Sequence, residues 1–259
     1  MNKDIVRQWT NLVALVAMIV VNVLANALPI NGQATGEISD RFAIYFVPAG
    51  YVFSIWGVIY LALIGFAIYQ LLPAQRENKR LQAIGYWFAF SSLVNIVWIF
   101  MWHYNVFALT LVLMLALLVS LIVIYLRLDI GRAKVSAAER WLVFVPFSIY
   151  LGWITVATIA NITSVLYFLQ WNGWGISPEA WTLIMLAAAV VIGAAVSLTR
   201  GDVAYAAVLI WAFAGIAVKH EDTTIVATAA WLAAAITAVF MLIGAYRHRQ
   251  QNQNAALAT

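Results

Sequence analysis

Long apolar runs, separated by short polar or turn-forming segments, fill almost the whole chain. A helix needs about 20 apolar residues to cross the hydrocarbon core of a bilayer. Eight runs have this character, at residues 9–29, 48–72, 81–102, 106–128, 140–163, 180–199, 203–218 and 224–246. The seventh is the shortest, with a helical length of about 24 Å. The pattern therefore predicts an all-α fold, a polytopic membrane bundle of about eight transmembrane helices.

The composition supports a membrane protein. Hydrophobic residues make up 65% of the 259 residues and charged residues only 9%, whereas soluble domains carry roughly 25% charged residues. The bilayer is therefore an expected partner, because apolar side chains can face lipid as well as one another. The net charge of +4 is no sign of nucleic-acid binding, since the placement of basic residues matters more than their sum. The chain has no cysteine, which excludes disulfides and thiolate metal sites.

Most Lys and Arg residues lie in every second connecting segment between the predicted helices. If the N-terminus lies inside and eight helices follow, twelve Lys and Arg fall on the inner side and only Arg41 and Lys219 on the outer side. Cytoplasmic loops of membrane proteins carry such an excess of Lys and Arg. We therefore predict an integral, multi-pass membrane protein with both termini in the cytoplasm.

The start of the chain has a second interpretation. Lys3 and Arg7, the apolar run that follows them, and the small residues Ala25 and Ala27 resemble a secretory signal peptide with its cleavage site. Cleavage would leave the topology of the remaining helices unchanged.

The chain changes character after residue 165. The second to fifth predicted helices are rich in Trp, Tyr and Phe, whereas the last three are rich in Ala. Small residues allow helices to approach closely, so we expect the last three to pack tightly, within the monomer or in a homodimer. We divide the chain into a five-helix unit at 1–165, three Ala-rich helices within 166–246, and a disordered polar tail at 247–259.

Three predicted helices carry a face that combines aromatic rings with small neutral groups. Spacings of three and four residues place such positions on one side of a helix. The faces contain Phe53, Trp56 and Tyr60; Asn95 and Trp98; and Tyr150, Trp153, Ala157 and Asn161, and the first helix adds Asn22 and Asn26. Amides in hydrocarbon are costly unless they find a partner. We therefore expect these faces to enclose an uncharged pocket for a large, flat, mostly apolar ligand.

A second interpretation of the same residues stays open. Trp and Tyr collect at membrane interfaces, and most Trp residues near the predicted helix ends fit that role. The deeper Trp56, Trp98 and Trp153 could serve helix packing without a ligand. Asn residues in membrane helices often form hydrogen bonds between helices and nothing more.

The motifs resemble the tryptophan-rich sensory protein (TspO/MBR) family, which includes the translocator protein, also called the peripheral benzodiazepine receptor. The residues that carry the resemblance are Pro48, Tyr51, Phe53, Trp56 and Tyr60 in the second helix, Asn95 and Trp98 in the third, and Pro146, Phe147, Trp153, Ala157 and Asn161 in the fifth. Ala49 stands where the family has a second proline. The resemblance covers residues 9–165, so it identifies the chain as a longer variant with three extra helices.

The resemblance implies a five-helix bundle that binds a porphyrin, another tetrapyrrole or a lipid-like molecule between helices 1, 2, 3 and 5. It also implies that the loop at 30–47 caps this pocket, with Arg41 as its only basic residue, and it suggests a homodimer. No cofactor is expected apart from such a tetrapyrrole. The candidate ligand-binding residues are Asn26, Tyr51, Phe53, Trp56, Tyr60, Asn95, Trp98, Tyr150, Trp153, Ala157 and Asn161.

Catalytic chemistry is not visible in the sequence. An enzyme needs acids, bases, nucleophiles or metals in fixed positions. His103, His220 and His248 lie in loops or at helix ends, and no acidic residue lies in the centre of a predicted helix. We therefore expect a sensor, receptor or translocator-like protein that is not an enzyme. The alternative is a transporter of a neutral or amphipathic small solute, with the three extra helices as a moving half.

Overall fold

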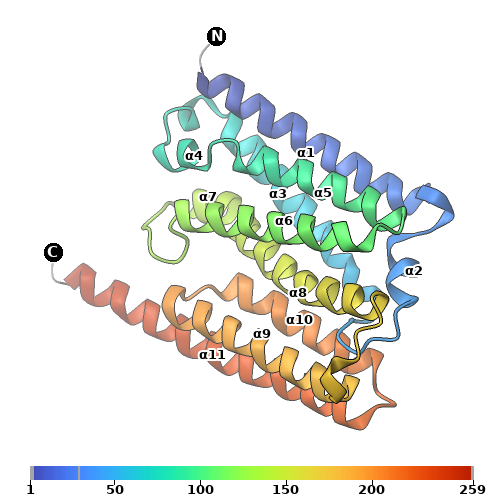
Figure 1. The fold of residues 1–259 in the computed structure, drawn as a ribbon. Coiled ribbons are helices and arrows are strands. Elements are labelled where there is room, and N and C mark those ends of the chain that lie inside the picture. Colours follow the sequence, from blue (N-terminus) through green and yellow to red (C-terminus); the bar gives the residue numbers. More distant parts are fainter. Residues whose placement is uncertain (1–2, 29, 258–259) are drawn as a thin grey trace.

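The structure is a computed structural model that describes residues 3–28 and 30–257. Within these residues every regular element is helical, which confirms the predicted fold class. The long helices are α1 (Lys3–Ala27), α3 (Ile55–Leu71), α5 (Trp87–His103), α6 (Phe107–Arg127), α8 (Val145–Phe168), α9 (Pro178–Arg200), α10 (Val203–Lys219) and α11 (Thr224–Leu257). Three short helices, α2 (Thr35–Asp40), α4 (Lys79–Ile84) and α7 (Ala137–Glu139), lie in the connecting segments (Figure 1).

Helices occupy all eight predicted segments, with shifted ends. Six helical segments are long and apolar enough to cross a membrane, and α5 and α10 are apolar helices of 17 residues each. The predicted third helix divides at Gly85, whose positive φ of 59° ends α4 and lets α5 start two residues later. The chain is therefore an integral, multi-pass helical membrane protein.

The end of α11 differs from the expected disordered tail. The helix continues through residues 247–257, where Arg, Gln and Ala all have high helix propensity. Residues 258 and 259 of that predicted tail lie outside the described part of the chain.

Five helices close into a ring. α1 packs against α3 and α5, α5 packs against α6, α6 against α8, and α8 against α3. Met18 of α1, Ile59 and Leu63 of α3, and Tyr150 of α8 are fully buried. The Tyr150 hydroxyl lies 3.8 Å from the Met18 sulfur, so side chains of α8 and α1 meet across the interior of the five-helix ring.

The last three helices form a second group, which we call the three-helix unit. α9, α10 and α11 pack against one another, and α10 also packs along α8 of the ring (Figure 1). α9 and α11 approach so closely that a Cβ added to Gly244 would lie 2.1 Å from the Ser197 carbonyl oxygen. This contact shows the tight packing that small residues allow.

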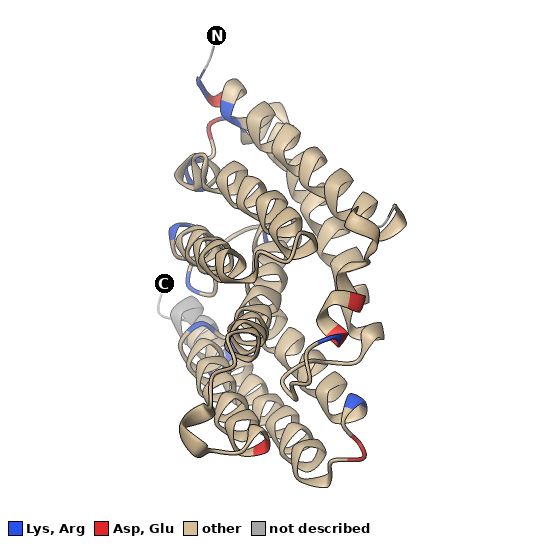
Figure 2. Cartoon of the chain, turned by 45° about the vertical axis from the view of Figure 1, so that its right-hand side comes forward, with Lys and Arg blue, Asp and Glu red and all other residues tan. Residues whose placement is uncertain are grey.

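The basic residues gather at one end of the bundle. The two chain termini, α4 and α7 lie at this end, and α2 lies at the other (Figure 1). Figure 2 shows Lys and Arg concentrated at the end that holds the termini. Among the described residues, Arg41 directly follows α2 and Lys219 is the last residue of α10, at the opposite end of the bundle (Figure 2). The cytoplasmic location of the basic end remains a prediction.

Candidate functional site

Five of the eleven candidate site residues meet where α3 packs against α8. We call them the aromatic cluster: Phe53, Trp56, Tyr60, Tyr150 and Trp153. The Trp56 ring stacks on Tyr60 with centroids 5.4 Å apart and meets Trp153 edge to face at 6.2 Å. Phe53 contacts Trp153 at 5.7 Å, and Tyr150 contacts Trp56 at 6.0 Å. These distances and angles are those that attractive aromatic pairs prefer.

Local structure aims these rings at one another. Phe53 lies in the 3₁₀ turn Gly50–Ser54 that leads into α3, and Trp56 and Tyr60 stand four residues apart on that helix. Tyr150 and Trp153 stand three residues apart on α8. Trp56 and Tyr60 stay partly exposed, whereas Tyr150 is fully buried. The cluster therefore has an inner side fixed in the core and an outer side nearer the surface.

One buried polar atom of the aromatic cluster has no partner among the described residues. Trp153 is only 3% exposed, and among the described residues its indole N–H finds no acceptor. The indole N–H of Trp98 is in the same situation. A buried donor without an acceptor costs about 1–3 kcal/mol, so native proteins rarely keep one without a reason.

Two of the amides expected to face the pocket are paired with other helices. Asn95 of α5 accepts a hydrogen bond of 2.7 Å from Asn22 of α1. Asn161 of α8 donates to the Thr110 hydroxyl of α6 over 3.0 Å. Both amides are buried and fasten neighbouring helices of the five-helix ring, which is the role that the packing interpretation gave them.

The remaining candidate residues lie apart from the aromatic cluster. Trp98 stacks on Trp102 at 5.3 Å near the end of α5. Tyr51 is half exposed and meets Trp211 of α10 edge to face. Asn26 is exposed at the end of α1, and Ala157 is partly buried along α8. The ligand-binding role of all eleven residues stays a prediction.

The loop at 30–47 lies over the end of the five-helix ring where α5 and α6 meet. Ile38 of α2 is fully buried in a small apolar cluster with Trp102 and Phe107. The Trp102 indole N–H donates to the Thr35 carbonyl oxygen over 3.2 Å. Arg41, the only basic residue of this loop, donates to the Asn105 side-chain oxygen. The loop thus covers this end of the ring, as the resemblance implies for its pocket.

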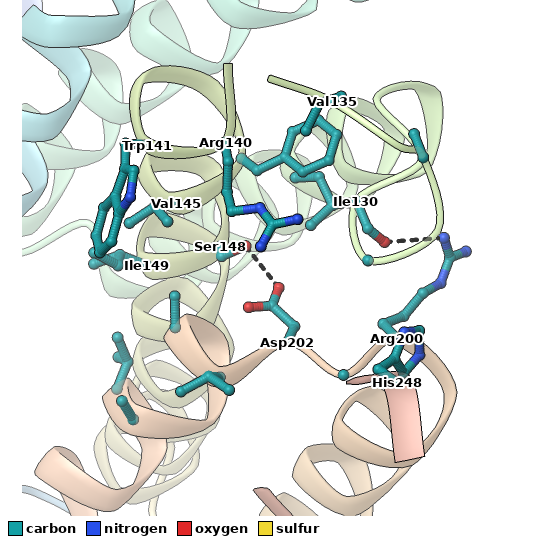
Figure 3. A pocket seen from close by; sticks show the side chains of 18 of the residues that line it. Ile130, Val135, Arg140, Trp141, Val145, Ser148, Ile149, Arg200, Asp202 and His248 are labelled. Atoms are coloured by element: carbon teal, nitrogen blue, oxygen red, sulfur yellow. Dashed lines mark hydrogen bonds between the residues drawn. The ribbon is translucent and has the colours of Figure 1, made fainter. Parts of the chain in front are cut away.

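A cavity of about 1100 Å³ opens between the five-helix ring and the three-helix unit, and its lining includes none of the eleven candidate residues. We call it the inter-unit cavity. It lies at the basic end of the bundle, and Figure 3 shows Arg140, Ser148 and Asp202 around it. No motif or helical spacing in the sequence predicted this site.

A buried carboxylate stands on one wall of the inter-unit cavity. Asp202 is 7% exposed and accepts hydrogen bonds from the hydroxyls of Ser148 (2.6 Å) and Tyr125 (2.9 Å). Its other oxygen caps α10 by accepting from the Tyr205 N–H at 3.1 Å. Burial raises the pKa of the Asp202 carboxyl, although these donors oppose the rise. The sequence held one indication of this buried position. Gly201 and Asp202 alone connect two predicted helices, and a connector of two residues is too short to carry Asp202 far from the helices that it joins.

Comparison with known proteins supports the resemblance and extends it. A family model described as TSPO-like protein matches residues 8–243. The match includes the three C-terminal helices, which the motifs of the sequence left outside the resemblance, so these helices are part of the family pattern. No curated protein and no solved structure matches the chain. The division of the chain at residue 165 remains a prediction.

Proposed function

The chain belongs to the TSPO-like protein family, and from this premise we propose that it is a membrane sensor that binds a hydrophobic ligand. The proposed ligand is a tetrapyrrole or a lipid-like molecule, and the proposed contact site is the aromatic cluster between α3 and α8. A flat apolar ligand suits a site with flat aromatic walls and few polar groups.

The unpartnered indole N–H of Trp153 is the observation that carries this proposal. The cluster rings offer faces for stacking, and this N–H offers one directed donor to a carbonyl or carboxylate of the ligand. The rings contact one another in the structure, so a ligand has to displace some of them. Phe53, Trp56 and Tyr60 are the members that such a ligand would displace, because they are only partly buried.

Contacts between α10 and the five-helix ring favour binding over transport. The Ala49 N–H donates to the Gly215 carbonyl oxygen over 3.0 Å, and the Trp211 indole N–H donates to the Val52 carbonyl oxygen over 3.1 Å. These bonds fasten the three-helix unit to the segment that enters α3. A transporter that moves this unit against the ring would have to break them in each cycle.

The proposal is tested by titrating protoporphyrin IX into the protein in nanodiscs and following the porphyrin absorbance. Trp153→Phe removes the N–H and keeps an aromatic ring. The matched control is Trp174→Phe, because Trp174 is 75% exposed in the loop between α8 and α9. We expect saturable binding that Trp153→Phe weakens about fivefold, the equivalent of one net hydrogen bond of ~1 kcal/mol.

Two results would overturn the proposal. Binding that does not saturate would show that protoporphyrin is not a specific ligand. Equal affinities for Trp153→Phe and Trp174→Phe would show that the aromatic cluster is not its binding site. Solute flux through proteoliposomes without saturable binding would support the transport alternative instead.

A further inference from the structure

The inter-unit cavity has the size of a ligand site. Its volume of about 1100 Å³ is at the upper end of the ~300–1,000 Å³ that ligand pockets usually have. It lies between α8 of the five-helix ring and the turn that joins α9 to α10 (Figure 3). A site of this size accommodates a lipid-sized molecule.

Positive charge dominates the lining of the cavity. Arg132, Lys134, Arg140 and Arg200 line it, against the single carboxylate of Asp202. Arg200 is already engaged, because it donates to Asp129 at 2.9 Å and to the Ile130 carbonyl oxygen at 3.2 Å.

Arg140 is a free cation at the cavity. Figure 3 shows its side chain extending into the cavity toward Ser148 and Asp202. No hydrogen bond or ion pair joins this guanidinium to any residue in the described ranges. No ion pair joins Asp202 to Arg140 among the described residues, and both Asp202 oxygens accept hydrogen bonds from other groups of the protein. Burial raises the pKa of Asp202, which favours its neutral form.

A π-helical turn places Arg140 at the cavity. The segment Arg140–Phe144 is π-helical, and the Val145 N–H bonds back to the Arg140 carbonyl oxygen. Pro146 follows at once, and the ring of a proline crowds the preceding helical turn, which a wider turn relieves. π-Helical turns often occur at functional sites.

The other wall of the cavity is apolar and comes from membrane helices. Ile55 and Val58 of α3, Ile149 of α8, and Val208 of α10 line it. Val58 is 52% exposed, and in a membrane helix such an exposed apolar residue faces lipid. Trp141 and Trp211 also line the cavity and are exposed. An exposed Trp near a helix end, such as Trp141, is typical of the membrane interface, whereas Trp211 lies in the middle of α10.

We propose that the inter-unit cavity binds an anionic phospholipid of the surrounding bilayer, with the lipid phosphate on Arg140 and an acyl chain along the apolar wall. Arg132 and Lys134 add positive charge beside the phosphate. Basic pockets between transmembrane helices on the cytoplasmic side bind anionic head groups in this way. The site shares no residue with the aromatic cluster, so it stands apart from the function proposed above.

The test compares lipids retained by the purified protein. Native mass spectrometry after delipidation and titration with phosphatidylglycerol or phosphatidylcholine measures the two affinities. We expect the wild-type protein to prefer phosphatidylglycerol and Arg140→Gln to bind it about fivefold more weakly, since one basic residue contributes ~1 kcal/mol. The matched control is Arg249→Gln, which removes an exposed arginine of α11 outside the cavity. Its affinity should equal that of the wild type.

A second variant tests the cavity without changing charge. Ala207 of α10 lines the cavity and is exposed, so Ala207→Phe fills space without disturbing the core. It should lower phosphatidylglycerol binding while leaving protoporphyrin binding intact. Equal retention of the two lipids by the wild type, or equal affinities for Arg140→Gln and Arg249→Gln, would overturn the proposal. Stronger binding of oleate than of phosphatidylglycerol would overturn the assigned lipid class.

Discussion

The side-chain amide of Asn22 donates to the side-chain oxygen of Asn95 over 2.7 Å, and this bond joins α1 to α5. The two residues are 5% and 2% exposed. Asn22 also donates to the Met18 carbonyl oxygen over 2.9 Å. Each amide therefore compensates the burial of the other, in the part of the five-helix ring that the sequence assigned to a ligand.

The first prediction concerns this amide pair. Asn95→Leu leaves the Asn22 amide without its side-chain acceptor, so we expect the free energy of unfolding to fall by about 1–2 kcal/mol. The double variant Asn22→Leu/Asn95→Leu removes both polar groups and should lose less than the sum of the two single variants. Unfolding in SDS, followed by circular dichroism, measures all four proteins. Strictly additive losses would show that the bond contributes nothing.

The second prediction concerns the contact between α10 and the segment before α3. A Cβ on Gly215 would lie 2.2 Å from the Val52 Cγ2 and 3.1 Å from the Pro48 Cβ, and Val52 is fully buried. Gly215→Ala should therefore lower the free energy of unfolding by about 1–3 kcal/mol through overpacking.

The matched control for that variant is Gly57→Ala in α3. No atom lies within 4 Å of a Cβ added to Gly57, and replacing a helical glycine by alanine gains about 0.5–1 kcal/mol. The thermal midpoints of the two variants in detergent should therefore move in opposite directions. If the Gly215→Ala protein were as stable as the wild type, Val52 and Pro48 would be able to shift and make room for the added methyl group, and the prediction would be wrong.

The sequence predicts the helices of this protein better than their contacts. Apolar length and the distribution of Lys and Arg were enough for eight helices, because the bilayer limits both. Helical spacing placed Trp98 and Asn95 on one face, but it does not tell which helix that face meets. In the structure Trp98 stacks on Trp102, and Asn95 pairs with Asn22.

Part of the aromatic cluster was predictable for a physical reason. Phe53, Trp56 and Tyr60 lie within eight residues, so the local geometry of the 3₁₀ turn and the start of α3 brings them together. The inter-unit cavity was not predictable in this way. Its lining comes from segments as distant as Ser54 and His248, and the orientation of Arg140 depends on a π-helical turn that apolar periodicity does not reveal.

The third prediction concerns the buried carboxyl of Asp202. Burial raises its pKa in the folded protein, whereas an unfolded chain has a carboxyl pKa of about 3.9. At pH values between the unfolded and the folded pKa, the Asp202 carboxyl keeps its proton in the folded protein and has released it in the unfolded chain. The stabilisation from this group is therefore complete below the unfolded pKa and is lost as pH rises through the folded pKa.

Asp202→Asn removes this dependence, because an amide resembles the neutral acid at every pH. We expect the thermal midpoint of the wild-type protein to fall relative to that of Asp202→Asn as pH rises from about 4 to 8. Thermal scans in detergent at a series of pH values measure the difference. Asp222→Asn, which removes an exposed carboxyl in the turn after α10, controls for the loss of one negative charge. If both variants changed the pH profile equally, or if neither did, the burial of Asp202 would not be the cause.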